Sequence, residues 1–362
     1  MLPKRTLLRY LILTLPLRVA HAQVPVQQWQ HCLGGSAEDK GYGIQDLPDG
    51  GYIIAGSTAS ADGEVSTALG GVDAWVVRLD ATGQLIWERS FGGSAEDVLK
   101  GVVLCADGGF ALAGYSTSTD GDVVGAHGGK DGWVVKLDSS GDPLWQVALG
   151  GSGMDQVYSI AQNANEDFIV CGESASNDGT VPTNSGMWDA WAVLLDNSGA
   201  VQWTKVLGGT DNDWFEHVTV LQNNNILLVG TATSLNGDFA SNHGCTDVIA
   251  VELAPDGSTV WSQCLGDELC QTGQGATDAP NGDLLIAGST NFSFDDTVST
   301  FSNGAYMAMR LDPAGAMLWE RAYPLYHYDV ATSITNDEDG GAILFGSCFS
   351  QPGTFDFDHS GY

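Results

Sequence analysis

Residues 87–145 read WERSFGGSAEDVLKGVVLCADGGFALAGYSTSTDGDVVGAHGGKDGWVVKLDSSGDPLW, and the rest of the chain repeats this pattern. One landmark recurs every 58 residues, at Trp29, Trp87, Trp145, Trp203, Trp261 and Trp319. A second keeps the same spacing, at Ala55-Gly56, Ala113-Gly114, Cys171-Gly172, Val229-Gly230, Ala287-Gly288 and Phe345-Gly346. So regular a period predicts one tandem-repeat architecture, although the length of 362 residues alone would suggest two domains.

Each repeat contains four short segments of strand-like sequence separated by Asp/Gly-rich turns. In the second repeat the predicted strands are Val98–Cys105, Phe110–Ser116, Gly132–Leu137 and Leu144–Ala148. Their apolar alternation favours antiparallel strands, and no segment has a helical period. Four strands repeated about six times predict an all-β fold, a β-propeller of about six four-stranded antiparallel blades, the last one incomplete. The recurring tryptophans are then expected to fill the gaps between blades, rather than to form a ligand-stacking face.

The ends of the chain depart from the repeat. Residues 1–22 have a basic start, a short apolar run and the small-residue site Ala20-His21-Ala22, which predicts a signal peptide cleaved after Ala22. Residues 23–362 would form the propeller, secreted or at the cell surface, and no segment is long and apolar enough for a membrane span.

Gln27–Leu33 looks like an isolated fourth strand, which would complete a sixth blade begun by Val330–Ser350. Because Tyr362 falls just before a third-strand position, we expect the sequence to be a C-terminally truncated fragment of a longer product. Whether the ring closes with six or more blades stays open.

Composition narrows the functional classes. The chain has 13 Lys+Arg against 45 Asp+Glu, for a formal net charge of −32. So acidic a protein would repel nucleic acid, and its 48 glycines disfavour helical bundles. Seven cysteines permit a bridge among Cys245, Cys264 and Cys270, whereas most others read as small buried apolar residues.

Carboxylates are expected to gather at the end of the propeller that carries the links between blades. The series comprises Asp39, Asp97, Asp155, Asp213 and Asp329 in the links, Asp62, Glu64, Asp120, Asp122, Asp178, Asp238, Asp295 and Asp296 in the loops, and Asp73, Asp131, Asp189 and Asp247 at the start of third strands. The favoured interpretation is loop structure, in which aspartate accepts backbone hydrogen bonds. The alternative is Ca²⁺ binding, for which Asp120 and Asp122 are the candidate ligands.

Residues that break the repeat near the expected central channel are better candidates for a site. Lys40, Tyr42, Lys100, Tyr158 and Trp214 are the candidate binding residues. Glu216 and His217 are the candidate catalytic residues, and ordinary filling of the channel is the competing interpretation. No nucleophile-elbow, HExxH or phosphate-loop motif occurs.

Two resemblances support the fold. The turn Leu79–Trp87, repeated at Leu137–Trp145, resembles the tryptophan-docking turn of quinoprotein-type propellers, and more loosely the Asp-box of sialidases. The whole unit, with Phe91–Asp97, Asp107–Phe110 and Asp131–Asp138, resembles a family of secreted bacterial β-propeller repeats. That resemblance implies an exported or cell-surface protein, often type IX-secreted, and implies little about activity.

The first hypothesis is therefore a secreted, non-catalytic binding module whose acidic loop face meets a protein, glycan or cation. The second is a polysaccharide-acting hydrolase or lyase with acid/base carboxylates near the channel. No cofactor besides calcium is suggested, and the oligomeric state stays open.

Overall fold

The computed structural model describes residues 29–292, 303–323, 329–336 and 341–348. These residues form five four-stranded antiparallel sheets and one two-stranded sheet. The first two sheets comprise β1 (Asp39–Asp46), β2 (Tyr52–Thr58), β3 (Asp73–Leu79) and β4 (Leu85–Phe91), then β5 (Asp97–Leu104), β6 (Phe110–Ser116), β7 (Asp131–Leu137) and β8 (Pro143–Leu149).

The next two comprise β9 (Asp155–Gln162), β10 (Phe168–Ser174), β11 (Asp189–Leu195) and β12 (Val201–Leu207), then β13 (Asp213–Val220), β14 (Ile226–Ala232), β15 (Asp247–Leu253) and β16 (Thr259–Leu265). The fifth comprises β17 (Gln271–Asp278), β18 (Leu284–Phe292), β19 (Asn303–Leu311) and β20 (Met317–Tyr323), and the last β21 (Asp329–Asn336) and β22 (Ala342–Cys348). A single 3-10 turn, η1 (Gly237–Phe239), is the only helical element among the described residues, and none of them forms a helix that could cross a bilayer.

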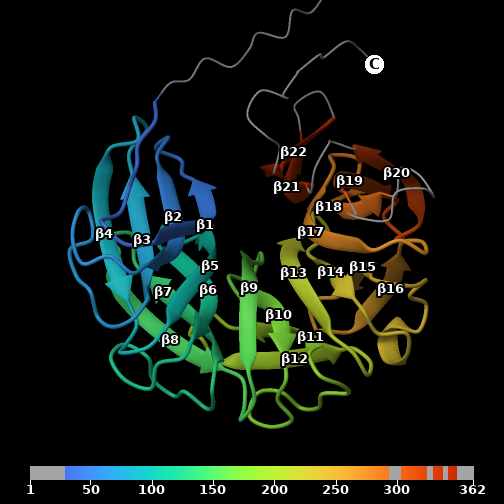
Figure 1. The fold of residues 1–362 in the computed structure, drawn as a ribbon, viewed down its shortest axis with the longest axis horizontal. Coiled ribbons are helices and arrows are strands. Elements are labelled where there is room, and N and C mark those ends of the chain that lie inside the picture. The colour runs from blue at the N-terminus through green and yellow to red at the C-terminus, as the bar shows by residue number, and fades with distance from the viewer. Residues whose placement is uncertain (1–28, 293–302, 324–328, 337–340, 349–362) are drawn as a thin grey trace, which may run out of the picture.

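The sheets follow one another around a central axis as the blades of a propeller (Figure 1). Each blade places its first strand innermost, so β1, β5, β9, β13, β17 and β21 are neighbours in turn around the channel. The predicted β-propeller is confirmed: within the described ranges there are five four-stranded blades and a sixth with two strands. In the second blade the predicted strands agree with the observed ones to within about a residue.

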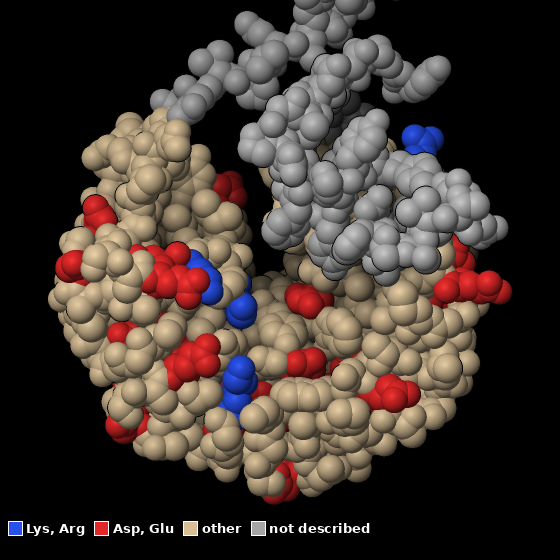
Figure 2. All heavy atoms as spheres, viewed as in Figure 1, with Lys and Arg blue, Asp and Glu red and all other residues tan. Residues whose placement is uncertain are grey.

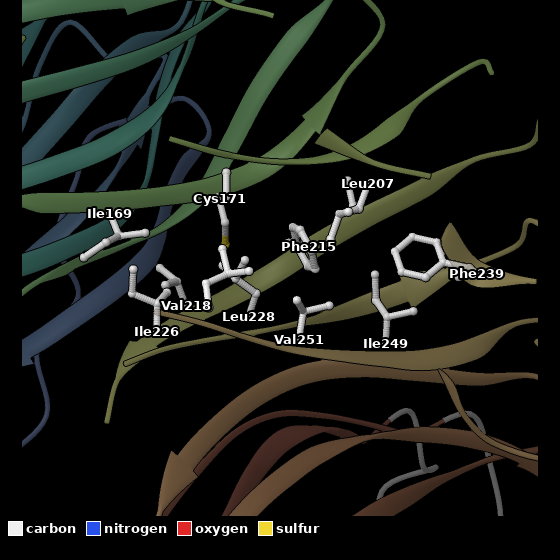
Figure 3. Close-up of a cluster of buried hydrophobic side chains, with 14 of the residues drawn as sticks. Ile169, Cys171, Leu207, Phe215, Val218, Ile226, Leu228, Phe239, Ile249 and Val251 are labelled. Carbon is white, nitrogen blue, oxygen red and sulfur yellow. The ribbon is translucent and has the colours of Figure 1, made fainter. Parts of the chain in front are cut away.

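Apolar side chains bind each blade to the next. Figure 3 shows the cluster between the third and fourth blades, which contains Cys171 of β10, Phe215 of β13 and Phe239 of η1. All three side chains are fully buried, and burying one large side chain of this kind contributes about 1.5–3 kcal/mol. The prediction that Cys171 acts as a small apolar residue is confirmed.

Fourth-strand tryptophans cross to the next blade and dock on a turn glycine. A Cβ added to Gly141 would lie 2.9 Å from the ring of Trp87, and Gly141 also has a φ of +84°, so glycine is required there twice over. The same contact recurs between Trp145 and Gly199. The expected role of these tryptophans in packing between blades is confirmed.

The N-terminal segment differs from expectation. Residues 29–33, the described part of the predicted strand Gln27–Leu33, form no strand. Trp29 nevertheless lies against Gly83, as Trp87 lies against Gly141, and its ring centroid is 5.8 Å from that of Tyr52. Trp29 thus packs on the first blade although its segment pairs with no strand. The predicted signal peptide and Tyr362 lie outside the described residues.

One disulfide joins the fourth and fifth blades. Cys245 and Cys270 are bridged with their Cα atoms 4.9 Å apart, whereas Cys264 is buried and free. Thr246, the residue after Cys245, also forms an isolated backbone β-bridge with Cys270, so the disulfide reinforces a contact between the two blades. This is one of the pairings that the sequence left open.

Candidate functional site

A β-bulge interrupts the innermost strand of every blade at one repeat position. In β1 the pairing with β2 jumps from Gly41 to Gly43 and leaves Tyr42 without a partner in the ladder. The residues left out in the six blades are Tyr42, Lys100, Tyr158, Glu216, Gln274 and Thr332. A bulge turns its extra residue away from the regular pleat, and bulges often re-aim side chains next to functional sites.

The glycine of the repeated second strand makes this bulge possible. A Cβ on Gly172 would lie 2.0 Å from the carbonyl oxygen of Gln156, and one on Gly230 would lie 2.0 Å from that of Trp214. Every second-strand glycine of the series meets its innermost strand in this way, at Gly56, Gly114, Gly172, Gly230, Gly288 and Gly346. The landmark that revealed the repeat therefore exists because any side chain would collide with the bulged backbone.

All six bulge residues line one central cavity of about 1280 Å³. We call the end of this cavity nearest the links, with its bulge residues, the channel mouth. Strands, turns and tryptophans repeat around the ring, but the bulge position holds two tyrosines, a lysine, a glutamate, a glutamine and a threonine. Four of the residues singled out from the sequence, Tyr42, Lys100, Tyr158 and Glu216, occupy this single position.

A smaller pocket of about 400 Å³ opens beside the mouth, between the third and fourth blades, and its lining comprises Tyr158, Glu173, Trp188, Asn212, Trp214 and Glu216. The Tyr158 hydroxyl donates to Glu173 Oε1 at 2.7 Å, and Trp214 Nε1 donates to Glu216 Oε1 at 2.9 Å. Gln156 Nε2 also donates to Glu173. The structure thus places an aromatic side chain against each of two carboxyl groups.

Both carboxyl groups are shifted toward the protonated form. Burial raises the pKa of Glu216 to about 7, and the nearby Glu173 adds to the shift while Lys100 opposes it. Burial likewise raises the pKa of Glu173. A carboxyl group that is half protonated near neutral pH is able both to donate and to accept a proton.

Lysines occupy the other side of the mouth. The Lys100 ammonium lies 3.6 Å from the ring centroid of Tyr42, and burial is the main cause that lowers its pKa. Lys40, the first residue after the link of the first blade, pairs with Glu38 at 2.9 Å. Figure 2 shows basic side chains gathered beside the central hollow, with acidic side chains across it.

His217 lines the same cavity beside Glu216. Burial lowers its pKa to about 4, so its ring is neutral near pH 7. Its contact is with the backbone of Ala276 in the next blade. We therefore assign His217 to the wall of the channel and keep Glu216 as the candidate acid/base.

The linking aspartates belong to the structure of the links. Asp97 is fully buried and accepts from Gly93 N at 2.7 Å, from Ser118 Oγ at 2.8 Å and from Ser116 Oγ. Asp155 repeats these bonds with Gly151, Ser174 and Ser176. The favoured interpretation, that aspartates accept backbone and loop bonds, is confirmed for these residues.

Most aspartates of two of the three series are buried and so do not contribute to the expected acidic face. Links and third-strand starts bury Asp73, Asp97, Asp131, Asp155, Asp189, Asp213 and Asp247. In the third-strand series one carboxylate oxygen accepts a backbone bond, whereas the other, Oδ1, is buried with no hydrogen-bond partner among the described residues. Burial is the main cause that raises the pKa of Asp189 to about 6.

Asp120 and Asp122, the candidate calcium ligands, take part in loop hydrogen bonds. Asp120 accepts from Ser94 N at 2.7 Å, and Asp122 accepts from Gly92 N at 3.2 Å. Among the described residues no group of three His, Cys, Asp or Glu is arranged to hold a metal ion. Calcium binding there stays a prediction, and the loop contacts already account for both residues.

Three residues at or beside the site, Glu173, Trp188 and Lys130, are not among the candidates from the sequence. Glu173 stands where other repeats have Ser57, Tyr115, Thr231 and Ser289, and Trp188 stands where they have Val72, Lys130 and Thr246. Lys130 stacks on Tyr115 at 3.8 Å. The signal was available, because these positions also vary while their neighbours repeat, but their proximity to the channel depends on how the blades pack.

Comparisons with known proteins add little to the site. No protein-family model matches the chain. It is 28% identical over 202 residues to the regulatory protein FlaEY of Caulobacter vibrioides, a match that covers 50% of this chain and 20% of FlaEY. The chain thus matches about a fifth of the length of that relative.

Among solved structures, the chain is similar to the polysaccharide lyase Uly1, at 12% identity and a TM-score of 0.47, over 92% of this chain and 86% of the other. It is also similar to BamB from Moraxella catarrhalis, at 14% identity and a TM-score of 0.35, over 85% and 84% of the two chains. At these values neither similarity carries a functional argument.

Proposed function

We propose that the channel mouth binds a glycan and that the chain acts as a glycan-binding β-propeller. The observation that carries the proposal is the bulge position, where each blade offers a different side chain although the surrounding scaffold repeats. Packing alone needs no such variety, since one residue type would fill all six positions. A ligand without sixfold symmetry accounts for the variety.

The chemistry of the pocket suits a sugar. Tyr158, Trp188 and Trp214 offer flat apolar surfaces with polar edges, and Glu173 and Glu216 offer acceptors for hydroxyl groups. With a volume of about 400 Å³ the pocket has room for one or two sugar rings, and it opens beside the longer channel. An oligosaccharide end is therefore a better match than an apolar ligand.

A second candidate function, cleavage of the bound glycan, follows from Glu216 alone. Its pKa of about 7 suits a general acid or base at neutral pH. Lys100 is near enough for its charge to act on Glu216. In a hydrolase Glu216 would donate a proton to the glycosidic oxygen as its bond to the sugar carbon breaks and water adds to that carbon. In a lyase it would remove a proton from a sugar carbon as the bond to the leaving oxygen breaks. Trp214 orients the Glu216 carboxyl group in either case.

Calorimetry on a glycan panel tests the binding proposal. Trp214→Ala is expected to weaken binding at least about tenfold by removing a stacking surface. Asp138→Asn, in a turn of the second blade that joins its third strand to its fourth, is the matched control and should bind as the wild type does. Equal affinity of Trp214→Ala and wild type would contradict the proposal.

For cleavage, product release from any bound glycan is measured between pH 5 and pH 9. Glu216→Gln is expected to bind the glycan and release no product. Turnover by this variant would refute the assigned role of Glu216, while leaving binding intact.

We also propose that the mature protein is exported, as the predicted signal peptide suggests. The Cys245–Cys270 disulfide supports this, because disulfides persist in oxidising compartments. Expression of the full chain in a bacterium with fractionation checks it: cleavage after Ala22 and recovery outside the cytoplasm are expected.

A further inference from the structure

Lys100 is a partly buried cation without a counter-ion. Among the described residues its ammonium has no hydrogen-bond or ion-pair partner, and only the face of Tyr42 lies against it, at 3.6 Å. The charges of Glu96 and Glu216 reach it, but neither carboxylate is within 4.0 Å of it in an ion pair. Taking a charge out of water without a partner is costly, so proteins usually pair such groups.

Two more lysines lie near it, in addition to the carboxylates of Glu96 and Glu216. The positive charges of Lys130 and Lys40 both lower the pKa of Lys100. Lys130 is held over Tyr115 at 3.8 Å and lies 3.5 Å from Gln156 Oε1. Three like charges thus lie near one another at one side of the channel, where Lys100 lines the cavity and Lys40 and Lys130 lie beside it, and two of them are placed over aromatic rings.

Such a cluster is conspicuous in this protein. The chain carries 13 Lys+Arg against 45 Asp+Glu, so chance alone would surround most lysines with acids. Lys136 follows that rule, because it lies 2.8 Å from Asp107 at the other end of the second blade. The field of so acidic a protein repels anions, and a local basic cluster is what would let an anionic ligand approach.

We propose that the channel mouth selects anionic glycans, with Lys100 and Lys130 binding a carboxylate or sulfate group of the sugar. This rests on the proposed glycan site and names its substrate class. The anionic group lies at the lysine edge, over the first and second blades, while the sugar ring reaches Tyr158 and Trp214. Lys40 is left out of this assignment, since Glu38 already pairs with it and offsets its charge.

Ligand charge and lysine charge are varied together in the test. Calorimetry at low and moderate salt compares three oligosaccharides of similar length: one neutral, one of galacturonate and one sulfated. The Lys100→Gln/Lys130→Gln variant is compared with wild type and with Lys205→Gln, which removes a lysine from the outer strand β12.

The wild type is expected to bind at least one anionic oligosaccharide about tenfold more tightly than the neutral one, with affinity falling as salt rises. The double variant should lose this preference and bind the anionic oligosaccharides no more tightly than the neutral one, and Lys205→Gln should match the wild type. The carboxylated and sulfated arms distinguish the two sources of charge.

Two outcomes overturn the inference in distinguishable ways. If the neutral oligosaccharide binds as tightly as both anionic ones, or if the double variant keeps the preference, the lysine assignment is wrong and the glycan site stands. If no oligosaccharide binds, the proposed function fails and takes the inference with it.

Discussion

Replacing Glu216 by glutamine is expected to stabilise the protein in a pH-dependent way. In the folded state burial raises the pKa of this carboxyl group to about 7 from an ordinary value of 4.5. Folded protein thus holds a proton between these pH values that unfolded protein has lost. The contribution of Glu216 to the stability of the wild type must therefore fall as pH rises through the window from 4.5 to 7.

The size of the effect follows from the same two values. Their difference corresponds to about 3 kcal/mol, which is fully expressed above pH 7. Glutamine carries no charge and is still able to accept the hydrogen bond from Trp214 Nε1. Relative to wild type, Glu216→Gln should gain about 3 kcal/mol in free energy of unfolding between pH 4 and pH 8.

Chemical denaturation at both pH values measures this gain. Glu88→Gln is the matched control, because Glu88 is buried and accepts from the indole of Trp75 at 2.8 Å, away from the channel. The gain of Glu216→Gln is read relative to that control. An equal difference between variant and wild type at pH 4 and pH 8 would refute the account of Glu216 as a buried carboxyl group with a raised pKa.

Three further predictions concern the scaffold. Gly230→Ala should destabilise the protein by more than about 2 kcal/mol, because the new Cβ would meet the Trp214 carbonyl oxygen at 2.0 Å. The control Gly129→Ala has nothing within 4 Å of the new Cβ and should change the melting temperature little. Similar melting temperatures of the two variants would contradict the steric argument. At pH 8 Asp189→Asn should cost less stability than Asp155→Asn, which loses a carboxylate that accepts from Gly151 N. Asp189 has a buried Oδ1 without a partner among the described residues and a pKa of about 6, so its charged form is disfavoured. Urea midpoints in the opposite order would count against this. Replacing Cys245 and Cys270 by serine should cost about 3.5 kcal/mol from the loop of 25 residues, and an unchanged urea midpoint would contradict a structural role.

The fold could be predicted because its determinants repeat. Glycine is needed at Gly172, where the bulged strand β9 of the same blade comes close, and at Gly141, where the ring of Trp87 from the preceding blade docks. Each repeat keeps these glycines, so the period becomes visible. The fourth-strand tryptophans are kept for the same reason, because those of the first four blades each pack on a turn glycine of the next blade. The prediction of a strand at Gln27–Leu33 had weaker support. In the other repeats a fourth strand pairs with the third strand just before it in the sequence, and this segment has no such strand before it.

The site was only half predictable. Residues such as Tyr42 and Lys100 stand out because they vary at one repeat position, but nothing in the sequence says that a bulge presents that position to the channel. Glu173 and Lys130 come from other strands and reach the mouth only through the packing of adjacent blades. The acidic series misled for the opposite reason: many aspartates serve the same buried structural bond in successive blades.

The most direct test exchanges the bulge residues for the one that the sixth blade carries. Thr332 shows that threonine fits the bulge, so the mouth variant replaces Tyr42, Lys100, Tyr158 and Glu216 with threonine. The rim variant replaces Asp62, Asp120 and Asp178 with asparagine, since Asn236 makes the equivalent bond to Thr210 N at 2.9 Å. Calorimetry with the tightest-binding glycan should show binding lost in the mouth variant and kept in the rim variant. Binding kept by the mouth variant and lost by the rim variant would contradict the account.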